Sequence, residues 1–131
     1  MQIAKSYKTL KNKLDRVFAL FIRKRDTKDG YGKCISCGKI CSYENLDCGH
    51  FINRRHLSLR WNEKNSNAQC RSCNRFDEGN NIGYITGMIR KYGEGVINEM
   101  ALKKNLPSKL SCFEIEQLIK YYQKINLVKD K

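Results

Sequence analysis

Two cysteine pairs of the form Cys-x-x-Cys are the clearest chemical signal in this chain. Cys34 and Cys37 form one pair, Cys70 and Cys73 form the other, and 32 residues lie between them. Four thiolates can bind one zinc ion tetrahedrally, and two such pairs in a short chain strongly indicate zinc. Because four protein ligands leave no position open for substrate, we expect the zinc to be structural. The alternative is a set of buried thiols without metal.

Three further cysteines, Cys41, Cys48 and Cys112, lie outside these pairs. We expect Cys112 to pack in a helix and the other two to be small buried residues, although either Cys41 or Cys48 could replace one of the four ligands. The first residues lack the apolar run and cleavage site of a signal peptide. We therefore expect a cytoplasmic protein, in which paired thiols favour metal over disulfides.

A histidine and an asparagine flank the second half of the predicted zinc site. His50 ends the stretch LDCGH, which we expect to be a strand, and Asn74 directly follows Cys73. A neutral imidazole can take a proton from water at cellular pH. An amide oxygen is a hard ligand that suits Mg²⁺ or Mn²⁺. The alternative is that both side chains are only structural.

The charge of the chain predicts a polyanionic partner. Lys and Arg number 26 against 13 Asp and Glu, which gives a net charge of +13 and a pI near 9.6. Residues 1–33 carry ten of the basic side chains and three acidic ones. Such an excess favours nucleic acid. A membrane is not expected, since no stretch approaches the roughly 18 apolar residues of a spanning helix.

The elements that must position these residues follow from the apolar pattern. Apolar residues from Ile3 to Phe21 recur at helical spacing, which predicts a basic amphipathic helix that extends to about Arg25 and ends before the Asp29-Gly30 turn. We expect its apolar stripe to be core, with a dimer seam as the alternative. Residues 34–37 predict a metal-binding knuckle.

The middle of the chain predicts a hairpin and then a helix. The stretches NLDCGHFIN (45–53) and HLSLRWN (56–62) read as two paired strands, and NAQCRSCNRFDEGN (67–80) as a short helix that stops at Gly79. Beyond residue 80 we expect three helices: one over 82–92, one over 93–105 that ends before Pro107, and one opened by a capping box at Ser111 and Glu114. Together these elements predict a single α+β domain, in which residues 1–33, 34–80 and 81–131 are successive parts.

The motifs resemble a known family. The order of zinc knuckle, histidine strand and CxxCN resembles the ββα-metal (HNH, or His-Me finger) nucleases, whose core is treble-clef-like. The stretches LDCGHFINRRHLSLRWNEKNSNAQCRSCNRFDEGN, LFIRKRDTKDGYGKCISCGK and MIRKYGEGV are similar to the NinG/Rap family of lambdoid phage recombination endonucleases. The resemblance covers about residues 18–100. It implies metal-dependent cleavage of branched DNA such as Holliday junctions, flaps and D-loops, with Mg²⁺ or Mn²⁺ as the catalytic ion.

The resemblance also implies roles for individual residues. His50 takes the position of the general base, Asn74 that of a metal ligand, and Asn65 that of the residue that braces the loop. Many HNH enzymes have Asp directly before the histidine, where this chain has Gly49. The acid lies instead at Asp47, which implies contact with the metal through water rather than directly. Asp77, one turn after Asn74, is a further candidate for orienting a water on the metal.

Five arginines near these residues are candidates for binding DNA phosphates: Arg54, Arg55, Arg60, Arg71 and Arg75. A guanidinium group binds phosphate oxygens in a fork, although each of these could instead be a solvated surface charge. A homodimer is plausible on one ground, since symmetric cutting of two strands needs two active sites. Two other functions stay open: a zinc-stabilised DNA-binding module without catalysis, and a less selective HNH nuclease.

Overall fold

The computed structural model describes residues 6–76 and 79–129. Its first element is a long basic helix, α1 (Tyr7–Arg25). The Ser6 hydroxyl caps α1 by accepting the Thr9 N–H at 3.1 Å. The predicted apolar stripe is buried at Leu10, Leu14 and Phe18, so its interpretation as core is confirmed. Residues 1–5, which include the predicted start at Ile3, lie outside the described residues.

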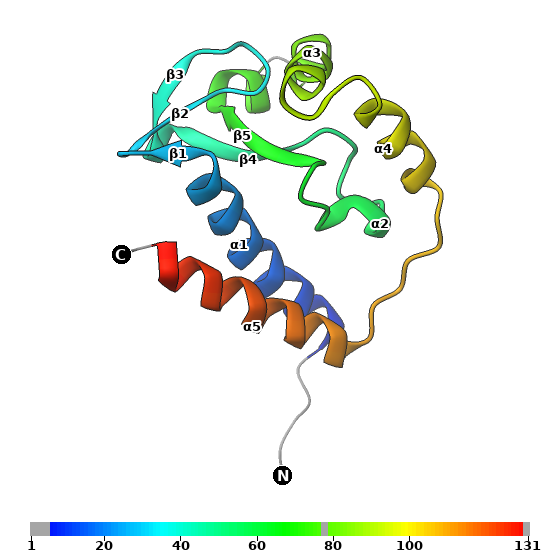
Figure 1. The fold of residues 1–131 in the computed structure, drawn as a ribbon. Helices are drawn as coiled ribbons and strands as arrows, with labels where there is room; N and C mark the ends of the chain where they lie inside the picture. The colour runs from blue at the N-terminus through cyan, green and yellow to red at the C-terminus, as the bar shows by residue number, and fades with distance from the viewer. Residues whose placement is uncertain (1–5, 77–78, 130–131) are drawn as a thin grey trace.

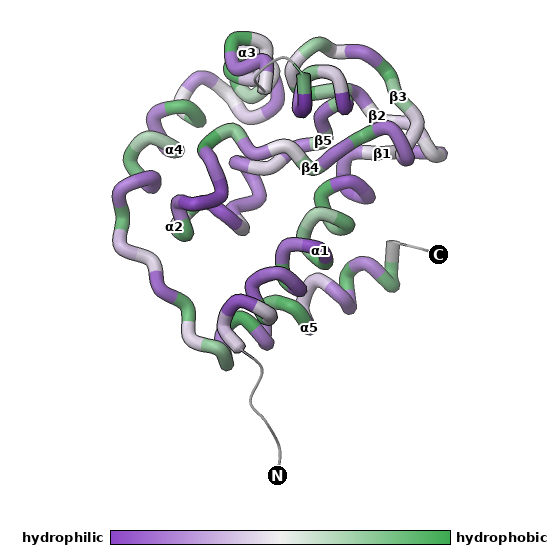
Figure 2. The backbone as a smooth tube through the Cα atoms, turned by 180° about the vertical axis from the view of Figure 1, so that it is seen from behind, coloured by the Kyte–Doolittle hydropathy of each residue, from purple (hydrophilic) through white to green (hydrophobic). Residues whose placement is uncertain are grey.

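The last helix, α5 (Cys112–Lys129), covers the apolar stripe of α1. The two helices run side by side in the same direction (Figure 1), and each mixes hydrophilic and hydrophobic residues along its length (Figure 2). The Tyr122 ring packs between Phe18 and Phe21 with centroids 5.1 and 4.9 Å away. The predicted capping box is confirmed, because the Ser111 hydroxyl accepts the Glu114 N–H and the Glu114 carboxylate accepts the Ser111 N–H.

A small antiparallel sheet carries the first cysteine pair. It consists of β1 (Thr27–Lys28), β2 (Tyr31–Lys33) and β3 (Ile40–Ser42) in that order. The predicted turn is confirmed, since Asp29 and Gly30 connect β1 to β2 with positive φ values of 54° and 84°. Cys34 and Cys37 lie in the loop between β2 and β3. A short 3₁₀ turn, η1 (Tyr43–Asn45), then leads into the second sheet.

The second sheet is a hairpin of β4 (Leu46–His50) and β5 (Ser66–Cys70). The first predicted strand is therefore confirmed, but the prediction of its partner over 56–62 is wrong. Those residues instead contain a one-turn helix, α2 (Leu57–Arg60), which starts after His56. Leu59 is fully buried beside Tyr84 and Met88, so tertiary packing outweighs the strand-like alternation of the segment.

The prediction of a helix over 67–80 is also largely wrong. Residues 67–70 belong to β5, and the wide helical turn η2 (Ser72–Phe76) follows, with residues 77–78 outside the described part of the chain. The register of the hairpin explains this difference, because Leu46 pairs with Cys70 and His50 with Ser66. Strand pairing therefore continues up to Cys70, the first cysteine of the second pair, so the described helical residues begin only after it.

Two helices beyond the hairpin, α3 (Asn81–Tyr92) and α4 (Val96–Lys104), agree with the prediction. They build a second core around Tyr84, Met88 and Met100, and Leu59 joins it from α2. An extended segment around Pro107 then leads to α5 (Figure 1). Within the described residues, no helix is both long enough and apolar enough to cross a membrane.

Two glycines let α3 lie directly on the backbone of the cysteine knuckle. A Cβ atom at Gly83 would meet the carbonyl oxygen of Ser36, and one at Gly87 would meet that of Ile35. These contacts would be with backbone atoms, which cannot move aside as a flexible side chain can. The two glycines, one turn apart, therefore fix how closely α3 approaches the knuckle.

We expect Gly87→Ala to lower the free energy of unfolding, measured by chemical denaturation. The overpacking costs about 2 kcal/mol, which exceeds the gain of up to about 1 kcal/mol from the better helix former. Gly95→Ala is the matched control, since a Cβ atom there has nothing within 4 Å, and it should change stability by no more than about 0.5 kcal/mol. Equal stability of the two variants would contradict this account of the α3 contact.

Candidate metal centre and histidine pocket

The four predicted cysteine ligands meet at one point. The sulfur atoms of Cys34, Cys37, Cys70 and Cys73 all lie within 4.8 Å of one another. A tetrahedron with Zn–S bonds of about 2.3 Å has S···S edges of about 3.8 Å, and the Cys37 and Cys70 sulfurs are 3.8 Å apart. The donor set and its spacing therefore fit a metal ion such as zinc, which these four side chains would hold.

Several N–H groups point at the sulfurs. The Cys37 and Cys73 backbone N–H groups each donate to the sulfur of the first cysteine in their pair at 3.5 Å, and the Asn80 amide donates to Cys73 at 3.4 Å. Hydrogen bonds of this kind stabilise the negative charge of a thiolate. The knuckle also donates the Ile35 N–H to the Ala68 carbonyl in β5 at 2.9 Å. The cluster thus joins two segments that are distant in the sequence.

The remaining cysteines lie outside this cluster. Cys41 packs against it and is half-buried. Cys48 is half-buried in β4, where burial raises its pKa to about 12, so the thiol stays protonated. Cys112 is exposed at the start of α5, so the expectation that it packs in a helix is wrong.

His50 and Asn74 line the same cavity. It has a volume of about 350 Å³, and the side chains around it come from α1, β4, the following loop and η2. Since β4 ends at His50 and η2 contains both Cys73 and Asn74, the hairpin and the cysteine cluster together hold the two side chains at one site. The proximity expected from the sequence is therefore present.

The hydrogen bond of His50 determines which ring nitrogen carries the proton. Its Nε2 lies 2.9 Å from the Arg60 carbonyl oxygen. A carbonyl can only accept, so Nε2 donates and Nδ1 keeps its lone pair. Burial lowers the pKa of His50, and the Arg60 carbonyl and the Asp15 carboxylate offset this only in part. The imidazole is therefore neutral at pH 7 and can accept a proton.

Asp15 of α1 holds the backbone that positions His50, and the sequence analysis missed it. Its carboxylate accepts hydrogen bonds from Arg60 Nε at 2.9 Å and Nη2 at 2.5 Å, and from Trp61 Nε1 at 3.0 Å. The same Arg60 supplies the carbonyl that binds His50. Asp15 is the one acidic residue in α1, a helix otherwise rich in Lys and Arg. A single acid among basic residues was the feature of the sequence that could have indicated this role.

Asp47 orients the amide of Asn74. The Asn74 Nδ2 donates to Asp47 Oδ2 at 3.0 Å, and Arg75 donates to both Asp47 oxygens at 2.9 Å. The nitrogen end of the amide faces Asp47, and among the residues that the structure describes its oxygen has no hydrogen-bond partner, so that oxygen can bind a cation. Both Asp47 oxygens are already in use, which matches an indirect role better than direct ligation.

Asn65 and Gly49 shape the loop and strand around His50. The buried Asn65 side chain accepts the Ile52 N–H at 2.9 Å and donates to the carbonyls of Ile52 and Leu59 at 3.0 and 3.1 Å. It thus braces the loop between β4 and β5. A Cβ atom at Gly49 would meet the Gln69 side chain. An aspartate at this position would therefore require the Gln69 side chain to move.

The geometry can now be compared with known proteins. Residues 1–130 match the family described as Bacteriophage Lambda NinG protein. The chain belongs to the NinG family. It is 35% identical over 86 residues to protein ninG of Escherichia phage lambda, which covers 65% of this chain and 40% of that protein. It is also 35% identical over 81 residues to protein ninG of Salmonella phage P22, which covers 61% of this chain and 38% of that protein. The matched segment thus spans about two-fifths of these curated relatives, and no solved structure matches the chain significantly.

The predicted phosphate-binding arginines of this NinG-family chain differ in their surroundings. Arg54 lines the cavity and is 63% exposed, 3.7 Å from Asp15. Arg60 is half-buried and bound to Asp15, so its guanidinium group holds the fold. The other three are exposed, although each has a hydrogen bond within the protein: Arg55, Arg71 and Arg75. Asp77, the other acid predicted near Asn74, lies outside the described residues.

We expect Cys37→Ser to lose the bound metal and the cooperative thermal unfolding of the protein. The cluster joins the knuckle to β5 and η2, so a missing ligand weakens both metal affinity and folding. Bound zinc can be measured by mass spectrometry of the purified protein, alongside a melting curve. Cys112→Ser removes an exposed thiol far from the cluster in sequence and should leave both measurements unchanged. Full zinc content in Cys37→Ser would remove Cys37 from the ligand set.

Proposed function

We propose that this NinG-family protein is a metal-dependent DNA endonuclease of the HNH (His-Me finger) type. One observation carries the proposal: the half-buried, neutral imidazole of His50 and the amide of Asn74, whose nitrogen end faces Asp47, line one cavity of about 350 Å³. Binding DNA would not require that pairing. The hairpin followed by η2, beside a four-cysteine cluster, supports a ββα-metal core of the same type.

His50 acts as the general base in this proposal. Its Nε2–H bond to the Arg60 carbonyl fixes the ring, so the Nδ1 lone pair can accept a proton from water. The released hydroxide then attacks the phosphorus, the bond from phosphorus to the 3′ oxygen breaks, and the leaving 3′ oxygen takes a proton from a water molecule. Cleavage on this route leaves a 5′-phosphate and a 3′-hydroxyl.

Asn74 would hold the catalytic ion through its amide oxygen, and Asp47 would keep the amide turned that way. Mg²⁺ or Mn²⁺, when bound, stabilises the negative charge that builds up on the phosphate and the leaving oxygen. An amide oxygen suits these hard ions better than it suits zinc, whose preferred thiolates are gathered in the cysteine cluster. The two metals would therefore occupy chemically distinct sites.

DNA is the substrate that the charge favours, and branched recombination DNA is the class that the resemblance to the NinG/Rap endonucleases implies. Arg54 at the cavity and the exposed Arg55 could bind phosphates next to the scissile bond. Lysines along α1, such as Lys8 and Lys13, are charges without base selectivity, so they would favour the shape of the DNA over its sequence.

We expect the purified protein to cut four-way junctions and flaps in preference to linear duplex when Mg²⁺ or Mn²⁺ is added. Radiolabelled substrates of equal length and composition, separated on denaturing gels, measure this preference. Equal cutting of branched and linear DNA would support a less selective nuclease and contradict the proposed preference for branched DNA. Binding without cutting of any substrate, at any concentration of either ion, would instead leave a DNA-binding module.

We expect His50→Ala to lower the cleavage rate by at least about a hundredfold, the usual contribution of a general base. DNA affinity and zinc content should stay at wild-type levels, since the imidazole binds neither in this proposal. His56→Ala is the matched control, because His56 is the other histidine and lies at the start of α2. Wild-type cutting by His50→Ala would remove His50 from the mechanism.

The pH dependence of cleavage should report the environment of His50. Protonation removes the lone pair, so kcat/KM should fall as the pH drops through the pKa of His50. Because burial lowers that pKa, the acid limb should lie below the ordinary histidine value of 6.5. A series of rates from about pH 5 to 8 at constant ionic strength measures its position. An acid limb centred above pH 7 would contradict a half-buried histidine that is neutral at pH 7.

A further inference from the structure

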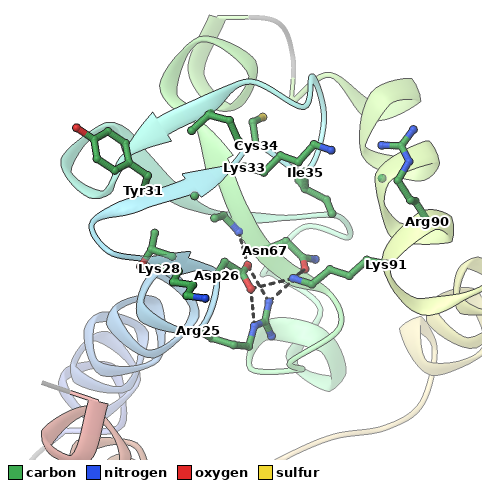
Figure 3. A pocket seen from close by; sticks show the side chains of 15 residues that line it. Arg25, Asp26, Lys28, Tyr31, Lys33, Cys34, Ile35, Asn67, Arg90 and Lys91 are labelled. Atoms are coloured by element: carbon green, nitrogen blue, oxygen red, sulfur yellow. Dashed lines mark hydrogen bonds and ion pairs between the residues drawn. The ribbon is translucent and has the colours of Figure 1, made fainter. Parts of the chain in front are cut away.

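A second and larger cavity lies on the β5 side of the hairpin. Its volume is about 550 Å³, and it forms where the end of α1, the sheet of the knuckle and α3 meet (Figure 3). Its lining includes Asn67 and Ala68 of β5, whereas Cys48 and His50 of β4 line the histidine cavity. The two cavities share no lining residue, and nothing in the proposed chemistry uses the second one.

The floor of this cavity is an ion-pair network in which two cations share the carboxylate of Asp26. Asp26 accepts hydrogen bonds from Arg25 Nε at 2.8 Å, from Lys91 Nζ at 2.9 Å and from the Ala68 N–H at 2.9 Å. Asn67 Oδ1 also accepts from Lys91, at 2.8 Å. The dashed lines of Figure 3 show how this network gathers at the base of the cavity. The floor is therefore rigid.

The rim differs from the floor because its cations are not paired. Lys28 of β1, Lys33 of β2 and Arg90 of α3 all line the cavity and are exposed. Among the residues that the structure describes, none of these three has an acidic partner. They come from three separate elements and surround the opening (Figure 3). A ligand in this cavity would therefore meet uncompensated positive charge at its edge.

The walls supply apolar surface that is exposed to solvent. Tyr31 is 60% exposed and Ile40 is 62% exposed, and both line the cavity together with Ile35. An exposed aromatic ring beside cations is the combination with which proteins bind single-stranded nucleic acid, because bases stack on the ring while cations bind the phosphates. Paired bases in a duplex offer no free face for such stacking.

We propose that this cavity binds an unpaired nucleotide of a single nucleic-acid strand. The base lies against Tyr31 and Ile40, and the flanking phosphates contact Lys28, Lys33 and Arg90. The identity of the strand rests on the proposed function, since branched DNA offers unpaired segments at its junctions. The binding itself does not depend on His50 or on cleavage.

The test measures binding of a fluorescein-labelled ten-nucleotide oligothymidylate by anisotropy, without divalent ions. The triple variant Lys28→Ala, Lys33→Ala, Arg90→Ala should bind at least about tenfold more weakly. Its plot of log affinity against log salt should be shallower by about 2, as the loss of three phosphate contacts on a single strand predicts. The control is Lys109→Ala, Lys120→Ala, Lys124→Ala, which removes the same charge from exposed positions outside the cavity. Equal losses in the two triple variants would overturn the proposal.

Tyr31 tests the contact with the base. Tyr31→Ala should weaken oligothymidylate binding by roughly tenfold, and Tyr31→Phe should retain it, since stacking needs the ring and not the hydroxyl. An abasic oligonucleotide of the same length should bind wild type and Tyr31→Ala equally. Competition by polyglutamate as effective as by oligothymidylate would show an acidic peptide site and overturn the proposal. The proposal would also be overturned if wild type bound a blunt duplex more tightly than oligothymidylate and the same variants lost that duplex binding.

His50→Ala separates this inference from the proposed function. It should bind oligothymidylate as wild type does, because His50 lies in the other cavity. If wild type cut no DNA but the cavity variants still lost oligothymidylate binding, the nuclease would be rejected and the nucleotide site retained. If His50→Ala lost cleavage while the cavity variants bound oligothymidylate normally, the nucleotide site would be rejected and the nuclease retained.

Discussion

The convergence of four sulfur atoms is the constraint on which the rest of the structure depends. The knuckle between β2 and β3 can reach Cys70 and Cys73 only if β5 ends beside it, and this requirement fits the observed pairing of Leu46 with Cys70. The same register places His50 at the far end of β4. Asn74 follows directly from Cys73. One cluster thus determines both where the strand ends and where the helical turn begins.

Two aspartates in and after α1 organise the two cavities. Asp15 binds Arg60 and Trp61 beside the histidine cavity, and Asp26 binds Arg25 and Lys91 below the second one. Each carboxylate compensates cations that would otherwise repel one another in a chain of net charge +13. Asp15 and Asp26, two of the three acidic residues in the basic amino-terminal region, therefore stabilise the fold.

Patterns that repeat along the sequence predicted the structure well, and features set by distant contacts did not. The helices α1, α3, α4 and α5 and the cysteine ligands followed from periodicity and spacing, as did the Asp29-Gly30 turn. The segment 56–62 alternates like a strand, but buried Leu59 and the Asn65 side chain hold it as a loop and one helical turn. Asp15 and the second cavity depend on contacts between residues more than 40 positions apart, which no local pattern reveals.

The pairing of the first and last helices also bears on how the chain folds during synthesis. Leu10, Leu14 and Phe18 are covered by Ile115, Ile119 and Tyr122, about a hundred residues later. Until α5 has emerged from the ribosome, the apolar side of α1 lacks its partner, and such late, long-range contacts slow folding. The nascent protein therefore exposes this apolar surface until α5 has been made, a state in which chaperones have reason to bind it.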